Sequence, residues 1–212
     1  MTQNAITFDE NGFEPRPDHK GIKLWYTPDG DGFGLVYYDI APDINADLNK
    51  VDEVRAFYRQ ATRNVGLGII EIDVMPVDGC LAVRTIFKAA QQPSGRTYIG
   101  ALTFPFRDFS YVLKVQCAEA GPTGARDAVL MMVLMEEGKV SSRTVGNVMA
   151  DWLDDPYDPN EKGEMTRNKS ERPEYDSQFP MHPLSRARRV LDHLQRTATV
   201  DSSIKSSAPF GR

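Results

Sequence analysis

The chain has 212 residues and a formal net charge of −5 at pH 7, with 41% hydrophobic and 26% charged residues. This composition is that of an ordinary globular protein and excludes a chain that is disordered throughout. The acidic balance argues against binding to nucleic acids or anionic membranes, because that binding depends on neutralising phosphate charge. We therefore expect one well-buried core and no nucleic-acid partner.

Residues 1–20 are polar, contain prolines and predict an N-terminal arm or loop. They have no basic start followed by an apolar core, so we expect no secretory signal. The longest apolar run, AVLMMVLM at 128–135, is far shorter than the roughly 20 residues that span a bilayer. We expect a cytoplasmic protein without a membrane span. Cys80 and Cys117 are then two reduced, buried thiols, with a single disulfide as the alternative.

Residues 21–65 predict a β-hairpin followed by a helix. GIKLWYT and FGLVYYDIA are apolar, aromatic runs separated by PDGDG, a turn-forming cluster. From residue 43 to 65 the apolar residues recur at three- and four-residue spacing, which indicates an amphipathic helix. The apolar positions that carry this spacing include Leu48, Val51, Val54, Phe57 and Tyr58. Gly66 and Gly68 are stop signals for the helix.

Residues 69–118 predict a meander of antiparallel strands. The strand candidates are IIEIDVMPV, CLAVRTIFKAA, RTYIGALTFPF and FSYVLKVQCAE. The short connections between them contain DG, PSG and PFRD, and connections of this length join antiparallel neighbours. Residues 122–137 then predict a helix closed by Gly138, although the run AVLMMVLM is also compatible with a strand.

The chain after about residue 140 predicts a loop-rich extension. Its stretch 149–178 is mostly polar, contains prolines and is typical of a long surface segment. Pro183 suits the first turn of a helix, and the leucine spacing after it predicts a helix over about 183–196. The expected organisation is an N-terminal arm (1–20), a core domain (21–140) and a C-terminal extension (141–212).

The predicted fold class is α+β, an antiparallel sheet of about six strands with helices packed on one face, plus the extension and its terminal helix. The order of elements, beginning with the hairpin KLWYTPDGDGFGLVYYDIA, resembles the PsbP-like α/β sandwich over residues 20–140. PsbP of photosystem II, a Ran-binding nuclear-transport factor and small bacterial chaperones of type VI secretion effectors share that fold. The resemblance implies protein binding without enzymatic activity. PFRDFSYVLKVQC and FPMHPLSRARR also resemble signatures of an uncharacterised bacterial family.

Sequence motifs for catalysis or cofactor binding are absent from the chain. The histidines are His19, His182 and His193, with no HExxH, and the cysteines form no CxxC, so no metal site is predicted. The chain has no GxSxG nucleophile motif and neither the GxxxxGK[ST] nor the GxGxxG phosphate loop. We expect no catalytic residue and no cofactor.

One candidate partner-binding group lies in FPMHPLSRARRVLDHLQR, residues 179–196. Leucines form the apolar stripe of the predicted helix, and a basic line runs beside it. Two interpretations are open for this line: it faces water while the leucines dock, or it binds acidic groups of a partner. The residues concerned are Arg186, Arg189 and His193.

Apolar residues supply two further candidates. Met131, Met132 and Met135 could form an adaptable surface for a partner, unless their helix is packed on the sheet. Phe104 and Phe106 flank Pro105 and could line a hydrophobic groove, unless they belong to an edge strand that the proline interrupts.

The leading functional hypothesis is a non-enzymatic protein-binding domain, such as an adaptor, an effector chaperone or an immunity-type protein. The first alternative is a small-molecule-binding or enzymatic domain with a pocket between sheet and helix, where Tyr37, Tyr111, Arg84 and Arg107 would supply polar groups. The second alternative is a homo-oligomeric subunit whose C-terminal segment wraps a second copy.

Overall fold

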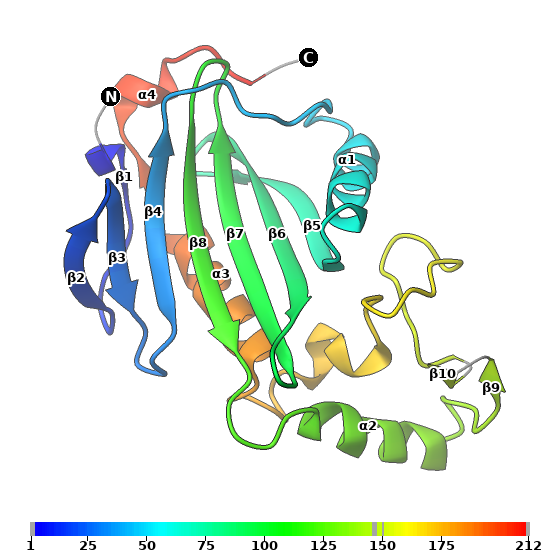
Figure 1. Cartoon of the computed structure of the whole chain (residues 1–212). Helices are drawn as coiled ribbons and strands as arrows, with labels where there is room; N and C mark the ends of the chain where they lie inside the picture. Colours follow the sequence, from blue (N-terminus) through cyan, green and yellow to red (C-terminus); the bar gives the residue numbers. More distant parts are fainter. Residues whose placement is uncertain (1–2, 146–147, 150, 211–212) are drawn as a thin grey trace.

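A computed structural model describes residues 3–145, 148–149 and 151–210. Residues 1–2 of the expected arm, and residues 146–147, 150 and 211–212 of the expected extension, lie outside the described residues. Within this part of the chain, seven strands form one antiparallel sheet in the order β2-β3-β4-β8-β7-β6-β5 (Figure 1). The predicted α+β class and antiparallel sheet are confirmed, with one strand more than the six expected.

The sheet joins the predicted hairpin to the predicted meander. β3 (Ile22–Tyr26) and β4 (Gly32–Tyr38) form the hairpin. The meander consists of β5 (Gly68–Val77), β6 (Cys80–Ala90), β7 (Arg96–Pro105) and β8 (Ser110–Ala118). β8 pairs with β4 along its length, which makes the two units one sheet.

The additional strand is β2 (Glu14–His19), in the segment that the sequence predicted as an arm or loop. It pairs with β3 at the edge of the sheet. Its sequence, EPRPDH, carries Pro15 and Pro17, which lack an N–H and are tolerated in a sheet only at an edge. The prolines therefore explain both the missed prediction and the position of the strand.

Short elements complete the chain. η1 (Gln3–Ala5) leads into β1 (Ile6–Thr7), which pairs with β11 (Thr199–Val200) and so ties the two ends of the chain together. α4 (Ser202–Lys205) follows β11. β9 (Thr144–Val145) pairs with β10 (Val148–Met149), and η2 (Lys169–Glu171) and η3 (Pro173–Tyr175) lie in the segment predicted as surface loop.

The predicted helices are α1 (Val51–Arg63), α2 (Ala125–Glu136) and α3 (Pro183–Thr197). Their placement corrects the expectation that the helices share one face of the sheet. In β6, Val83 packs in a cluster with Val54 of α1, whereas the adjacent Ala82 packs in the cluster of α3. Adjacent residues of a strand point to opposite faces, so α1 and α3 cover opposite faces, as Figure 1 shows.

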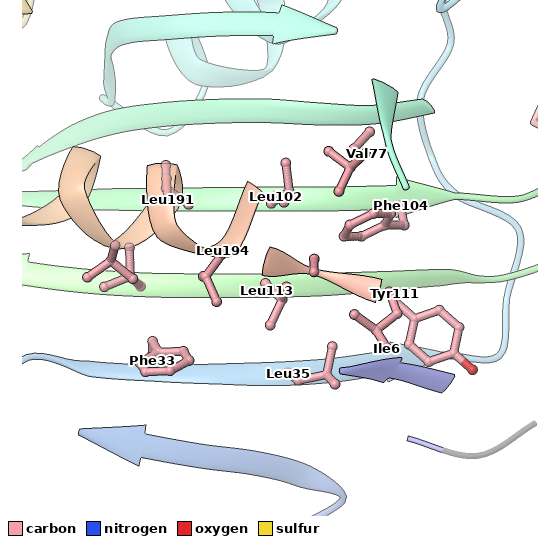
Figure 2. Close-up of a cluster of buried hydrophobic side chains, with 14 of the residues drawn as sticks. Ile6, Phe33, Leu35, Val77, Leu102, Phe104, Tyr111, Leu113, Leu191 and Leu194 are labelled. Atoms are coloured by element: carbon pink, nitrogen blue, oxygen red, sulfur yellow. The ribbon is translucent and has the colours of Figure 1, made fainter. Parts of the chain in front are cut away.

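The main core lies between α3 and the sheet. Figure 2 shows Leu191 and Leu194 of α3 beside Leu102 and Leu113 of β7 and β8, and these leucines are fully buried. A Cβ added at Gly100 would lie 2.9 Å from Leu191 Cδ1, so this glycine allows the helix to approach the sheet closely. Each buried leucine contributes about 1.5–3 kcal/mol. The helix of the expected extension therefore supplies a central part of the core.

The cysteines occupy different environments. Cys117 on β8 is fully buried, as predicted, whereas Cys80 at the start of β6 is partly exposed. Both are free thiols. Burial raises the pKa of each thiol, so neither has the lowered pKa of a reactive thiolate.

Candidate functional site

The basic residues predicted on α3 contact the chain itself. Arg186 Nε and Nη2 donate to Asp31 Oδ2 and Oδ1 at 2.7 and 2.9 Å, and its side chain is only 13% exposed. Arg189 Nη2 donates to Asp29 at 2.5 Å. His193 Nε2 donates to a main-chain carbonyl oxygen in the loop before β2, at 2.6 Å. The expectation that this line faces water is thus corrected for Arg186, whose guanidinium is held by the β3–β4 turn.

The phenylalanines predicted to line a groove lie in the interior. Phe104 is 0% exposed and Phe106 is 4% exposed, and both belong to the main core. The ring of Phe106 stacks on Phe109 with centroids 4.7 Å apart. The prediction of a hydrophobic groove at this position is therefore wrong, because both rings pack in the main core, to which Val200 and Ile204 of the C-terminal segment also belong.

The methionines of α2 divide between two environments. Met131 is partly buried against the cluster of Leu134, Val140 and Trp152. Met132 is 65% exposed and Met135 is 36% exposed. The helix packs on this cluster and on η2 and does not lie on the sheet, which overturns the alternative that α2 is a sheet-packed core helix.

Val129 and Val133 extend the exposed apolar surface of α2. They are 48% and 40% exposed. Val129 lies three residues before Met132 and four before Val133, so the three side chains share one side of the helix. We call Val129, Met132, Val133 and the neighbouring Met135 the α2 stripe. It faces away from the residues that anchor the helix, Leu130 and Leu134, which are both 2% exposed.

A buried guanidinium fixes the N-terminal part of α2. Arg126 is 1% exposed, and its donors reach the main-chain carbonyl oxygens of Ser170 and Arg172 and the side chains of Asp176 and Ser185 at 2.8–3.0 Å. These acceptors come from η2, from the segment before α3 and from α3. Because every one of these contacts is a directed hydrogen bond, α2 is held in one orientation relative to the C-terminal segment.

A buried ion pair fixes η2 under the sheet. Lys88 Nζ donates to Glu171 Oε2 at 2.6 Å, and the Tyr98 hydroxyl donates to Oε1 at 2.8 Å. Burial opposes ionisation of Glu171, yet the charge and hydrogen bond of Lys88 hold the pKa of this carboxyl below its usual value. These residues were not predicted from the sequence, because a polar segment such as 149–178 is normally exposed.

A cleft of about 370 Å³ opens at the N-terminal end of α2, where the β8–α2 connection meets residues 178–183. Pro122, Phe179 and Pro183 give it apolar walls, and Glu119 and His182 line it as well. Sequence analysis did not identify this cleft, because its two sides are far apart in the chain. The one available signal was Pro183, which marks the start of α3.

His182 is the N-cap residue of α3, because its Nδ1 accepts a hydrogen bond from the main-chain N of Leu184 at 3.3 Å. An accepting Nδ1 is unprotonated, so the neutral ring carries its proton on Nε2. Burial, aided by the positive charge of Arg126, lowers the pKa of His182 to about 4. The imidazole is therefore neutral at pH 7.

The described residues bear on two of the predicted classes. They contain no group of three or more His, Cys, Asp or Glu side chains that is arranged to hold a metal ion. None of the described helices is long and apolar enough to cross a membrane.

The chain shows little similarity to known proteins. No protein-family model and no curated protein matches the chain. A solved structure of a protein from Bacteroides thetaiotaomicron is similar to it at 8% sequence identity and a TM-score of 0.35, over 57% of this chain and 41% of that one. The chain thus spans about two fifths of that protein's length. The resemblance to the PsbP-like sandwich stays a prediction.

Proposed function

We propose that this protein is a protein-binding domain that docks its partner on the α2 stripe. The observation that carries the proposal is the exposure of four large apolar side chains on one 12-residue helix, counted among the described residues. A helix that is apolar on all sides is normally covered on all sides. In the part of the chain that the structure describes, α2 is covered on one side only. We infer that a partner protein covers the other side, the α2 stripe.

The chemistry of the stripe suits a partner surface. Methionine is flexible and polarisable, and it adapts to apolar surfaces of different shape. The four side chains are already about half buried, so covering the rest would contribute roughly 3–6 kcal/mol, whereas association opposes binding by about 4–15 kcal/mol. The stripe is therefore an anchor within a larger interface and not the whole of it. The hydrogen bonds of Arg126 support this role, because they hold the helix rigid before binding.

The enzymatic alternative has less support. It requires a pocket between the sheet and a helix, but Leu184, Ala187 and Leu191 fill the interface of α3 with the sheet and are 0% exposed. A hollow of about 240 Å³ lies where α1 meets β5, and its Arg59 is already paired with Asp155 at 2.6 Å. Arg84, one of the polar groups assigned to that pocket, is already bonded to Glu71 at 2.6 Å. In the homo-oligomeric alternative the partner is a second copy of this chain. The comparison of variants described next also tests that alternative.

The test compares two double variants. Val129→Lys with Met132→Lys places charge on the stripe, and Ile40→Lys with Val65→Lys is the matched control at apolar residues that are 68% and 67% exposed. Affinity purification with crosslinking is expected to recover a stoichiometric partner with the unaltered protein and the control, and to lose it with the stripe variant. A partner retained by the stripe variant, or none at stoichiometric level with the unaltered protein, contradicts the proposal. A dimer that the stripe variant abolishes would identify a second copy as the partner.

A further inference from the structure

The cleft at the N-terminal end of α2 places a hydrogen-bond donor beside a hydrogen-bond acceptor. Glu119 follows β8 directly, and His182 caps α3. Both side chains are only 9% exposed, and His182 Nε2 lies 3.8 Å from Glu119 Oε1. The cleft volume of about 370 Å³ falls at the lower end of the range of small-ligand sites, about 300–1,000 Å³.

The donor and the acceptor are both available to a ligand. The separation of 3.8 Å exceeds hydrogen-bond distance, so among the described residues the Nε2–H of His182 has no hydrogen-bond acceptor. Glu119 Oε1 accepts from Gly124 N at 3.0 Å, and Oε2 accepts from Arg96 N at 2.7 Å. A carboxylate oxygen has two lone pairs, so Oε1 retains a free position next to the histidine donor.

The charges around the cleft disfavour an anionic ligand. The carboxylate of Glu119 stands beside the donor, and the ring of His182 is neutral. Arg126 and Arg186 also line the cleft, but their guanidinium groups are occupied. Arg186 donates to both carboxylate oxygens of Asp31 and to two main-chain carbonyl oxygens. Arg126 makes four hydrogen bonds within the C-terminal segment.

We propose that this cleft binds a primary carboxamide, whose oxygen accepts from His182 Nε2 and whose N–H donates to Glu119 Oε1. A carboxamide carries an acceptor and a donor side by side, and paired groups of this kind are recognised together, as when an amide side chain reads adenine. The apolar part of the ligand lies against Phe179 and Pro122. A carboxylate of the same shape lacks the donor and adds charge repulsion. The carboxamide belongs either to a peptide side chain or to a free small molecule.

The first test is a titration of the uniformly ¹⁵N-labelled full chain at pH 7 with isovaleramide and with isovalerate, followed by NMR. We expect isovaleramide to give saturable shifts at the imidazole nitrogens of His182 and at the main-chain amides of Arg96 and Gly124. Isovalerate is expected to bind at least roughly tenfold more weakly, because the hydrogen bond to Glu119 Oε1 is lost and the two carboxylates repel each other. Equal binding of the two, or no saturable shift with the amide, would overturn the proposal.

Variants make the test specific. His182→Asn keeps a side-chain oxygen that caps α3 but removes the Nε2 donor, so we expect isovaleramide to bind roughly tenfold more weakly. His19→Asn, at an exposed histidine of β2, is the matched control and should bind normally. Glu119→Gln removes the negative charge and should reduce the discrimination against isovalerate. Unchanged amide affinity in His182→Asn contradicts the assignment.

Further titrations distinguish a peptide ligand from a small molecule. A further variant separates the proposal for the cleft from the proposal for the α2 stripe. Tighter binding of acetyl-glutamine-methylamide than of isovaleramide assigns the carboxamide to a peptide side chain, and the reverse assigns it to a small molecule. Acetyl-glutamate-methylamide serves as the charged control for the peptide probe. The double variant Val129→Lys with Met132→Lys should bind isovaleramide normally, so the cleft and the α2 stripe succeed or fail independently.

Discussion

α3 and α2 show opposite relations between sequence pattern and environment. α3 is amphipathic and basic, yet Arg186 on its polar side is 13% exposed and Arg188 is 7% exposed. α2 is apolar on every side over residues 128–135, yet Met132 is 65% exposed. The partners of the arginines lie on distant segments, the β3–β4 turn and the residues before α3. Periodicity thus predicts which side of a helix is apolar, whereas tertiary contacts decide which side is covered.

The largest effect is expected where the C-terminal segment enters the interior. Glu171→Ala leaves the charge of Lys88, a residue 4% exposed, without its carboxylate. We expect the free energy of unfolding to fall by about 3–5 kcal/mol, because an unpaired buried charge is strongly destabilising. Urea denaturation measures this loss. The double variant Lys88→Met with Glu171→Leu should recover much of the stability, and a loss below about 1 kcal/mol in Glu171→Ala would show that the pair is solvated.

A second effect concerns pH and the start of α3. The pKa of His182 is about 4 in the folded chain and 6.5 ordinarily, so between these values the unfolded chain binds a proton that the folded chain does not. Stability therefore falls as the pH is lowered from 6.5 to 4, by up to about 3 kcal/mol. The charged groups that act on the ring are Arg126, Glu171, Asp176 and Arg186, and the carboxylate of Glu119 lies 3.8 Å from Nε2.

His182→Asn isolates this contribution, because asparagine caps the helix but does not titrate. Denaturation at pH 7 and pH 4.5 should show a smaller pH dependence in this variant than in the unaltered chain. His19→Asn, the exposed control, should retain the full dependence. An identical pH dependence in all three proteins would contradict the neutral, capping role of His182.

A third prediction addresses the basic line of α3 directly. A double-mutant cycle with Arg186→Ala and Asp31→Ala is expected to give a coupling energy of roughly 1–2 kcal/mol, because the pair is bidentate and mostly buried. Lys50 and Glu53, whose side chains are 62% and 50% exposed, form the matched control pair and should show a much smaller coupling. Equal coupling energies in the two pairs would indicate that Arg186 is exposed to solvent, as the first interpretation of the basic line assumed.

The smallest expected effect on stability lies on α2. Met132→Lys should change the free energy of unfolding by within about 0.5 kcal/mol, because the side chain is 65% exposed. Thermal denaturation checks this value. A loss of several kcal/mol would show that the α2 stripe is covered within the chain, and the contrast between the two helices would disappear.

The elements that could be predicted from the sequence are those with a local cause. The spacing of Val51, Val54 and Tyr58 reflects the helical period of α1, and the short turns between 69 and 118 reflect antiparallel pairing. The elements that were missed depend on distant contacts. Glu171 is polar and lies among polar residues, and its contacts with Lys88 on β6 and Tyr98 on β7 explain its burial.

The candidate sites follow the same rule. The methionines of α2 were identified because an apolar run stands out in the sequence, and their exposure separates Met132 from Met131. The cleft was not identified, since Glu119 and His182 meet only when β8 and α3 are packed together. The expectation of a groove at Phe104 was wrong because this ring packs in the main core with Val200 and Ile204, and their sequence carries no local signal for that contact.

The most direct test of the account is oxidative footprinting of the methionines, in the purified protein and in native lysate. Met132 and Met181 are matched probes, because they are 65% and 62% exposed. If α2 docks a partner, Met132 is protected from oxidation in lysate while Met181 reacts as in the purified protein. Equal oxidation of Met132 in both samples would contradict the claim that the α2 stripe is the binding surface.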